Sequence, residues 1–170
     1  ETGFFLFDIG LFQGCVLSTI LFDAVFNLLL DFLDPLEKEV GFAFKGIAGV
    51  KGLSKAYADD LTLTTSTPAG NQLALNETVK WLDWTVTMKA KPKKCFHIAY
   101  KRFDPRTKRQ THVKYDRVQY SVFDAKLVIK GEPVHFIHNP ANPDAFKQRH
   151  FKFLGRYIDA SVTETRMQQK

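Results

Sequence analysis

The chain has 170 residues, 45% of them hydrophobic, and only two cysteines. This length fits one ordinary domain, and the apolar content excludes a disordered or low-complexity protein. Two cysteines exclude a disulfide scaffold and a four-cysteine zinc site. The formal net charge of +6 is uneven, because residues 1–50 carry −5, residues 51–88 carry −1 and residues 89–170 carry +12. We expect a polyanionic partner, most often nucleic acid, for the C-terminal half, with a solvated basic surface as the alternative.

The N-terminal third predicts a strand and a long helix. Residues 4–9 form an apolar, aromatic-rich run that favours a buried strand. Ser18 occupies the position of a helix N-cap, and the helix that follows should end near Pro35. Polar residues interrupt the apolar run of this helix, so we do not expect a membrane span. Helical spacing predicts a largely buried helix whose core positions are Leu21, Ala24, Val25, Leu28, Leu29, Phe32 and Leu33.

The middle of the chain predicts a hairpin and a second helix. Apolar and β-branched residues at 55–58 and 61–65 flank the acidic pair Asp59 and Asp60, which favours two strands joined by a tight turn at that pair. Thr67 and Pro68 then open a helix that should end near residue 88. A basic loop follows at residues 90–94.

The C-terminal half predicts strands and turns. A basic, turn-rich segment spans residues 101–114, and residues 160–170 favour a frayed helix or tail. The strand-like runs are 95–100, 118–123, 125–129, 134–137 and 151–158. Strand, helix, hairpin, helix and further hairpins in this order predict an α+β fold around a mixed or antiparallel sheet.

Asp59 and Asp60 are the sharpest chemical signal in the sequence. Two adjacent carboxylates repel each other, and a half-buried turn makes that repulsion costlier. A bound cation would offset the cost, and hard carboxylate oxygens suit Mg²⁺. The alternative is a solvated turn that binds nothing.

Four motifs resemble those of reverse transcriptases, and they occur in the family's order. The box from Tyr57 to Asp60 (Y-A-D-D) resembles the family's metal-binding motif, and residues 10–18 resemble its G-x-x-Q-G-x-x-x-S motif before a long helix. Residues 91–95 resemble its lysine-bearing loop, and residues 151–155 (F-K-F-L-G) are similar to its primer-grip strand. The hairpin pattern over residues 122–136 looks most like non-LTR (LINE-type) retrotransposon enzymes.

This resemblance implies a fold and an activity. The fold would be a ferredoxin-like or RRM-like polymerase palm over residues 4–159, with an antiparallel sheet, a long buried helix and C-terminal hairpins. The activity would be RNA-directed DNA polymerisation by two-metal chemistry, with Mg²⁺ or Mn²⁺, an RNA template, a DNA primer and deoxynucleoside triphosphates, inside the cell in the cytoplasm or nucleus. Residues 1–3 would be a cloning remnant or fragment boundary, and residues 160–170 a tail or the start of a thumb connection.

The resemblance also implies roles for single residues. Asp59 would be the metal ligand with Asp60 in support, and Lys94 would protonate the leaving pyrophosphate or offset its charge. The residues expected against the nucleotide and template are Gln13, Gly14 and Tyr57. The expected primer-grip residues are Phe153, Leu154 and Gly155, for which core packing is the alternative. The expected contacts with the nucleic-acid backbone are Lys93, Lys101, Arg102, Arg106, Lys108 and Arg109, for which a solvated surface is the alternative.

One expected part of the family pattern is missing. The family needs a further Asp on an earlier palm strand, but the chain begins 12 residues before Gln13, and Asp8 lies too close to serve. We therefore expect a fragment that is inactive alone and that lacks the upstream part of its own polymerase. The alternative is a degenerate or domesticated palm fragment that binds RNA or DNA without catalysis. The sequence predicts no oligomeric state.

Overall fold

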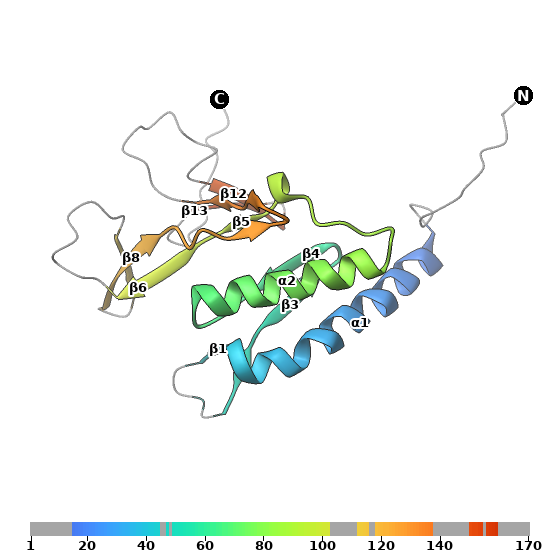
Figure 1. Cartoon of the computed structure of the whole chain (residues 1–170), viewed down its shortest axis with the longest axis horizontal. Helices are drawn as coiled ribbons and strands as arrows, with labels where there is room; N and C mark the ends of the chain where they lie inside the picture. Colours follow the sequence, from blue (N-terminus) through green and yellow to red (C-terminus); the bar gives the residue numbers. More distant parts are fainter. Residues whose placement is uncertain are drawn as a thin grey trace, which may run out of the picture. The chain divides into compact units, whose positions relative to one another are not determined.

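The computed structural model describes residues 15–44, 47, 49–102, 112–115, 118–137, 150–154 and 156–159. The chain divides into two compact units, Glu1–Ala90 and Lys91–Lys170. Two α-helices occur together with small sheets, whose described strands pair antiparallel apart from one parallel pair (Figure 1). The predicted α+β class is therefore confirmed, whereas the expected strand at 4–9 and the C-terminal tail lie outside the described residues.

Helix α1 (Val16–Val40) differs from the prediction at both ends. It begins earlier than an N-cap at Ser18 would allow, because the Ser18 N–H already donates to the Cys15 carbonyl at 3.1 Å. It also continues through Pro35, where we expected its end. Proline removes one backbone hydrogen bond from a helix, but Leu36 and Val40 beyond it pack against the core and hold the last turns in place.

The buried face of α1 agrees with the prediction only in part. Leu29 and Leu33 are buried as predicted, together with Phe26, whereas the other predicted core positions are exposed. The helix is apolar nearly all round, so its periodicity alone could not identify the face that packs. The large apolar residues of α1 that are exposed are Val16, Leu17, Ile20, Leu21, Val25, Leu28 and Phe32.

Helix α1 is also long and apolar enough to cross a membrane by length and composition, contrary to our expectation from its interrupted apolar run. One such helix near the N-terminus is only weak evidence for a membrane span. Signal sequences and core helices of water-soluble proteins meet the same criterion.

Helix α2 (Pro68–Trp84) packs beside α1 and starts where the sequence predicts (Figure 1). The Thr67 hydroxyl accepts a hydrogen bond from the Gly70 N–H at 3.0 Å, and Pro68 occupies the first helical turn. The helix ends at Trp84, four residues before the expected end.

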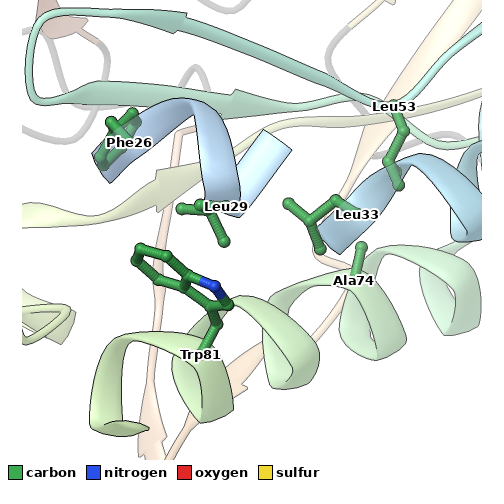
Figure 2. Packing of buried hydrophobic residues seen from close by; sticks show 6 residues of the cluster. All are labelled: Phe26, Leu29, Leu33, Leu53, Ala74 and Trp81. Carbon is green, nitrogen blue, oxygen red and sulfur yellow. The ribbon is translucent and has the colours of Figure 1, made fainter. Parts of the chain in front are cut away.

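The core of the first unit lies between these two helices. Figure 2 shows Trp81 and Ala74 of α2 pointing toward Leu29 and Leu33 of α1, with Leu53 close to Leu33. Burying each large apolar side chain contributes about 1.5–3 kcal/mol, so this cluster is what fixes the helix pair.

Two antiparallel hairpins complete the first unit. Strand β1 (Phe42–Ala43) pairs with β2 (Lys51–Gly52), and β3 (Ser54–Tyr57) pairs with β4 (Asp60–Leu63). The Glu37 carboxylate of α1 accepts the Leu53 N–H at 3.1 Å. This bond ties the start of the second hairpin to the helix.

The second unit begins with the 3-10 turn η1 (Pro92–Lys94) and strand β5 (Phe96–His97). The predicted strand 95–100 breaks at Ile98, after which β6 (Ala99–Arg102) begins. Strand β8 (Val118–Phe123) lies between β6 and β7 (His112–Tyr115) in a three-stranded sheet.

Three short pairings follow in the second unit. The predicted strand 125–129 begins only at Val128, where β9 (Val128–Ile129) pairs with β10 (Glu132–Pro133), and β11 (His135–Phe136) pairs in parallel with β5. The single strand predicted at 151–158 is instead a hairpin of β12 (His150–Phe153) and β13 (Arg156–Asp159). Leu154, with a φ of +47°, lies at the turn that reverses the chain.

Candidate active site

The acidic pair lies at the tip of the β3–β4 hairpin. Tyr57 and Asp60 face each other across the last pair of the ladder, so Ala58 and Asp59 form a two-residue loop. The predicted hairpin is confirmed, but its turn is shifted by one residue because Asp60 already belongs to β4.

The two faces of this hairpin have different environments. Leu61 and Leu63 point to the face that packs against the helix core. Side chains alternate between faces along a strand, and directly opposed residues share a face, so Tyr57 and Asp60 lie on the face away from the core. The helices thus support the hairpin from one side and leave its acidic side open.

Asp59 and Asp60 are both exposed, and Tyr57 is 69% exposed. Within the described part of the chain, no hydrogen bond or ion pair engages either carboxylate. Their oxygens are therefore available to a ligand.

Ala58 gives the loop a strained backbone. Its φ of +50° lies in the left-handed region, which residues with a Cβ atom rarely adopt. Such a residue costs on the order of 1–3 kcal/mol, and such residues concentrate at functional sites. This conformation lets the chain reverse within two residues, which places Asp59 in the loop and Asp60 at the start of β4.

The oxygen ligands at the tip are of the type that binds a divalent cation, but they are too few to complete its coordination. Two adjacent carboxylates supply the hard oxygen ligands that Mg²⁺ prefers. Among the residues that the structure describes, no three His, Cys, Asp or Glu side chains gather as a metal site would require. A cation at this tip would need further ligands from substrate phosphates, from water or from additional carboxylates.

A comparison with protein-family models matches residues 2–158 to the family described as reverse transcriptase (RNA-dependent DNA polymerase). The chain belongs to the reverse transcriptase family. Members of this family generally use divalent metal ions, an RNA template and nucleotide substrates. No curated protein and no solved structure shows significant similarity to this reverse transcriptase chain.

The lysine loop of the reverse transcriptase chain lies in its second unit. Lys93 and Lys94 are both exposed on η1. The turn is closed by hydrogen bonds from the Lys94 N–H to the Lys91 carbonyl at 2.8 Å and from the Cys95 N–H to the Pro92 carbonyl at 3.0 Å. Both ammonium groups are thus presented to solvent by a short, hydrogen-bonded turn.

The other predicted contacts are only partly described. Lys101 is exposed on β6, with its ammonium 5.8 Å from the centre of the Phe123 ring. Arg102 ends β6, Phe153 ends β12, and Leu154 is exposed in the turn that follows. The predicted site residues outside the described part of the chain are Gln13, Gly14, Arg106, Lys108, Arg109 and Gly155.

Two residues on the open face of the hairpin were not predicted from the sequence. Lys55 and Thr62 are directly opposed and share this face with Tyr57 and Asp60, and Lys55 is exposed. The signal was present, because Lys55 precedes Tyr57 by two residues and a strand repeats its faces every second residue.

Proposed function

We propose that this chain is the palm region of a reverse transcriptase from a non-LTR (LINE-type) retroelement, and that its β3–β4 hairpin binds the catalytic metal ions. The observation that carries this proposal is the exposure of Asp59 and Asp60 at the tip of a hairpin whose opposite face packs on the helices. The proposal includes a ferredoxin-like palm over residues 4–159, with a thumb connection or tail at residues 160–170.

The residues at the hairpin take distinct roles. When bound, the two divalent ions stabilise charge on the attacking and leaving oxygens of nucleotidyl transfer. Asp59 holds the metal, and Asp60 supports it from the first position of β4. Tyr57 shares a face with Asp60 and contacts the incoming nucleotide or the template. Lys94 protonates the leaving pyrophosphate or offsets its charge.

The remaining roles follow the order of the family motifs. Gln13 and Gly14 lie against the nucleotide and template, and Phe153, Leu154 and Gly155 hold the primer end. The protein works inside the cell, in the cytoplasm or nucleus. The residues that contact the nucleic-acid backbone are Lys93, Lys101, Arg102, Arg106, Lys108 and Arg109.

Two carboxylates make a partial site for two metal ions. The lack of a third gathered ligand among the described residues supports the view that the 170-residue chain extends primers very weakly or not at all by itself. A further carboxylate from elsewhere in the polymerase would complete the site. The competing proposal, a non-catalytic RNA- or DNA-binding module, is supported by the same incomplete donor set together with the net charge of +12 over residues 89–170.

Metal binding at the tip can be tested without relying on catalysis. Paramagnetic Mn²⁺ titrated into the full chain should broaden the backbone NMR signals of residues 57–61 selectively. Asp59→Asn should strongly reduce that broadening, because the substitution removes a negative charge and an anionic ligand while keeping the shape of the side chain.

The matched control is Asp34→Asn, which changes an exposed carboxylate of α1. In this variant, Mn²⁺ should broaden the signals of residues 57–61 as much as in the unmodified chain. The proposal fails if residues 57–61 do not broaden, or if Asp59→Asn leaves the effect unchanged. Primer extension on an RNA template with Mg²⁺ separates the two functions, because activity that Asp59→Asn abolishes excludes the non-catalytic module.

A further inference from the structure

A buried histidine joins three segments of the second unit. The His97 side chain extends from β5 and is 4% exposed. It contacts the stretch of residues 124–127 between β8 and β9, named here the 124–127 segment. On another side the Phe136 ring of β11 lies 5.4 Å from it, centre to centre, at an interplanar angle of 31°.

The hydrogen bonds of His97 favour one neutral form of the ring. Nε2 lies 3.1 Å from the Asp124 carboxylate and 3.3 Å from the Ala125 backbone nitrogen. A neutral Nε2 cannot donate to the first and accept from the second at once. A proton on Nε2 satisfies the shorter contact, which is to a carboxylate, and leaves Nδ1 as a bare acceptor.

Nδ1 is buried and, among the described residues, has no hydrogen-bond partner. A bare acceptor there is tolerated, but protonation would add a charged N–H group at a place that offers no well-formed acceptor. Burying a charged donor without a partner is strongly unfavourable. The closed arrangement therefore fits the neutral ring and not the protonated one.

We propose that His97 is a pH-sensitive latch: its neutral ring ties β5 to the 124–127 segment, and protonation at Nδ1 releases that segment. The backbone connects the same pieces, because the Val134 N–H bonds to the Leu127 carbonyl at 2.9 Å and the Ile137 N–H bonds to the His97 carbonyl at 3.1 Å. Loss of the His97 contacts should therefore loosen β11 as well as the 124–127 segment. The latch lies wholly within the second unit and does not depend on the proposed metal site.

The net shift of the His97 pKa agrees with this direction, although the charged groups around the ring act in opposite senses. Burial lowers the pKa of the imidazole below its ordinary value, and the charge of His135 lowers it further. The Asp124 charge and hydrogen bond raise the pKa without reversing the shift, and an interaction with the Val134 backbone also raises it. The Val134 backbone forms no hydrogen bond with Nδ1.

Asp124 itself remains an anion. Burial would raise the pKa of its carboxyl, but hydrogen bonds from the Lys126 side chain and backbone N–H, with the charges of Lys126 and His97, bring the pKa below its usual value. The anion is therefore present throughout the pH range in which His97 titrates. An ionised partner keeps Nε2 as the donor.

Hydrogen exchange of the full chain between pH 5 and pH 8 tests the latch. After correction for the intrinsic exchange rate, the opening of residues 124–137 should be constant above about pH 6.5, the ordinary pKa of histidine. Below it, opening should increase up to tenfold per pH unit, because the open state binds one more proton, and should level off below the folded pKa of His97. His97→Gln keeps an N–H donor without a titrating group, so its profile should be flat.

A second variant keeps the proposal testable if His97→Gln does not fold. Asp124→Asn retains an acceptor for Nε2 but removes the negative charge that favours the protonated ring, so it should move the transition to lower pH. His135→Gln, at an exposed histidine on the neighbouring strand, should keep the transition. The latch is refuted if wild-type opening is flat with pH, if His97→Gln retains the rise, or if Asp124→Asn fails to lower the midpoint.

Discussion

Val86 combines a β-branched side chain with a φ of +65°, just beyond the C-terminal end of α2. Its N–H bonds to the Asp83 carbonyl at 3.1 Å, as in a left-handed helix cap. Glycine is the usual residue in this conformation, because a Cβ atom there costs about 1–2 kcal/mol. The side chain is 76% exposed, so packing offsets little of this strain.

Val86→Gly should therefore stabilise the chain. Relief of the strain exceeds the extra backbone entropy of glycine, which costs about 0.5–1 kcal/mol, so a net gain of about 0.5–1 kcal/mol is expected. Thermal unfolding followed by circular dichroism should show a Tm higher by a few degrees.

The matched control is the next residue, Thr87, which is exposed and does not have a positive φ. Thr87→Gly carries the entropy cost without relief of strain and should lower the Tm. A Tm for Val86→Gly at or below that of the unmodified chain would show that Val86 is not strained in solution.

At the scale of the elements, α1 and α2 are in close contact at Gly70. A Cβ atom added there would lie 2.9 Å from Cβ of Val40 on α1 and 3.1 Å from the Thr67 hydroxyl. The first separation is shorter than carbon atoms tolerate, and neither Cβ can rotate away. Gly70 thus allows the two helices to pack at this distance.

Gly70→Ala should destabilise the chain even though alanine is the better helix former. Replacing glycine inside a helix normally gains about 1 kcal/mol. Here the overlap with Val40 should cost more than this gain and leave a net loss of about 1–2 kcal/mol in the free energy of unfolding. Urea denaturation of Gly70→Ala and of the unmodified chain measures this difference in the free energy of unfolding.

Asn76→Ala serves as the comparison on an exposed position of the same helix, where the substitution removes only a hydrogen bond from Gln72. It should change the free energy of unfolding by less than about 0.5 kcal/mol. Equal or greater stability of Gly70→Ala would show that α1 and α2 are not in close contact there.

Elements with strong local signals could be predicted from the sequence. Thr67 followed by Pro68 correctly gave the start of α2, and the apolar runs on both sides of Asp59 and Asp60 correctly gave the hairpin. The turn was misplaced by one residue because it depends on the positive φ of Ala58, which side-chain pattern does not encode. The buried face of α1 was predicted only in part, because tertiary contacts choose between two apolar faces.

In the candidate site, too, the residues with a local sequence signal were predicted and those defined by tertiary contacts were not. The acidic box at the hairpin tip was found from the motif and local pattern, whereas Lys55 was missed because its face is defined only by pairing with β4. His97 and Asp124 lie 27 residues apart, and no local pattern connects them. Their contact depends on the parallel pairing of β5 with β11 and on the path of the 124–127 segment.

At the scale of the whole molecule, charge and structure divide at nearly the same place. Residues 89–170 carry +12, and the second unit begins at Lys91. The acidic hairpin tip belongs to the first unit, which has a net negative charge. The second unit is thus the expected binding surface for a nucleic-acid backbone.

Binding of single-stranded RNA should consequently be strongly salt-dependent. Release of counterions from about three phosphates predicts a Kd that rises roughly twentyfold between 50 and 200 mM salt, measurable by fluorescence anisotropy with a labelled oligonucleotide. Replacing Lys93, Lys94 and Lys101 together by alanine should weaken binding and reduce this salt dependence.

Lys80→Ala provides the control, because this exposed lysine of α2 belongs to the first unit. It should leave both the affinity and its salt dependence nearly unchanged. Salt-independent binding, or equal weakening by Lys80→Ala, would contradict a backbone contact concentrated in the second unit.

The outer face of α1 also affects how the protein behaves at high concentration. Its exposed apolar residues form a surface that water solvates poorly, and large surfaces of this kind favour self-association. None of these side chains is part of the buried core, so their replacement by polar residues would reduce the tendency to aggregate without opening a cavity. The residues that limit how concentrated a sample can become are therefore different from those that keep it folded.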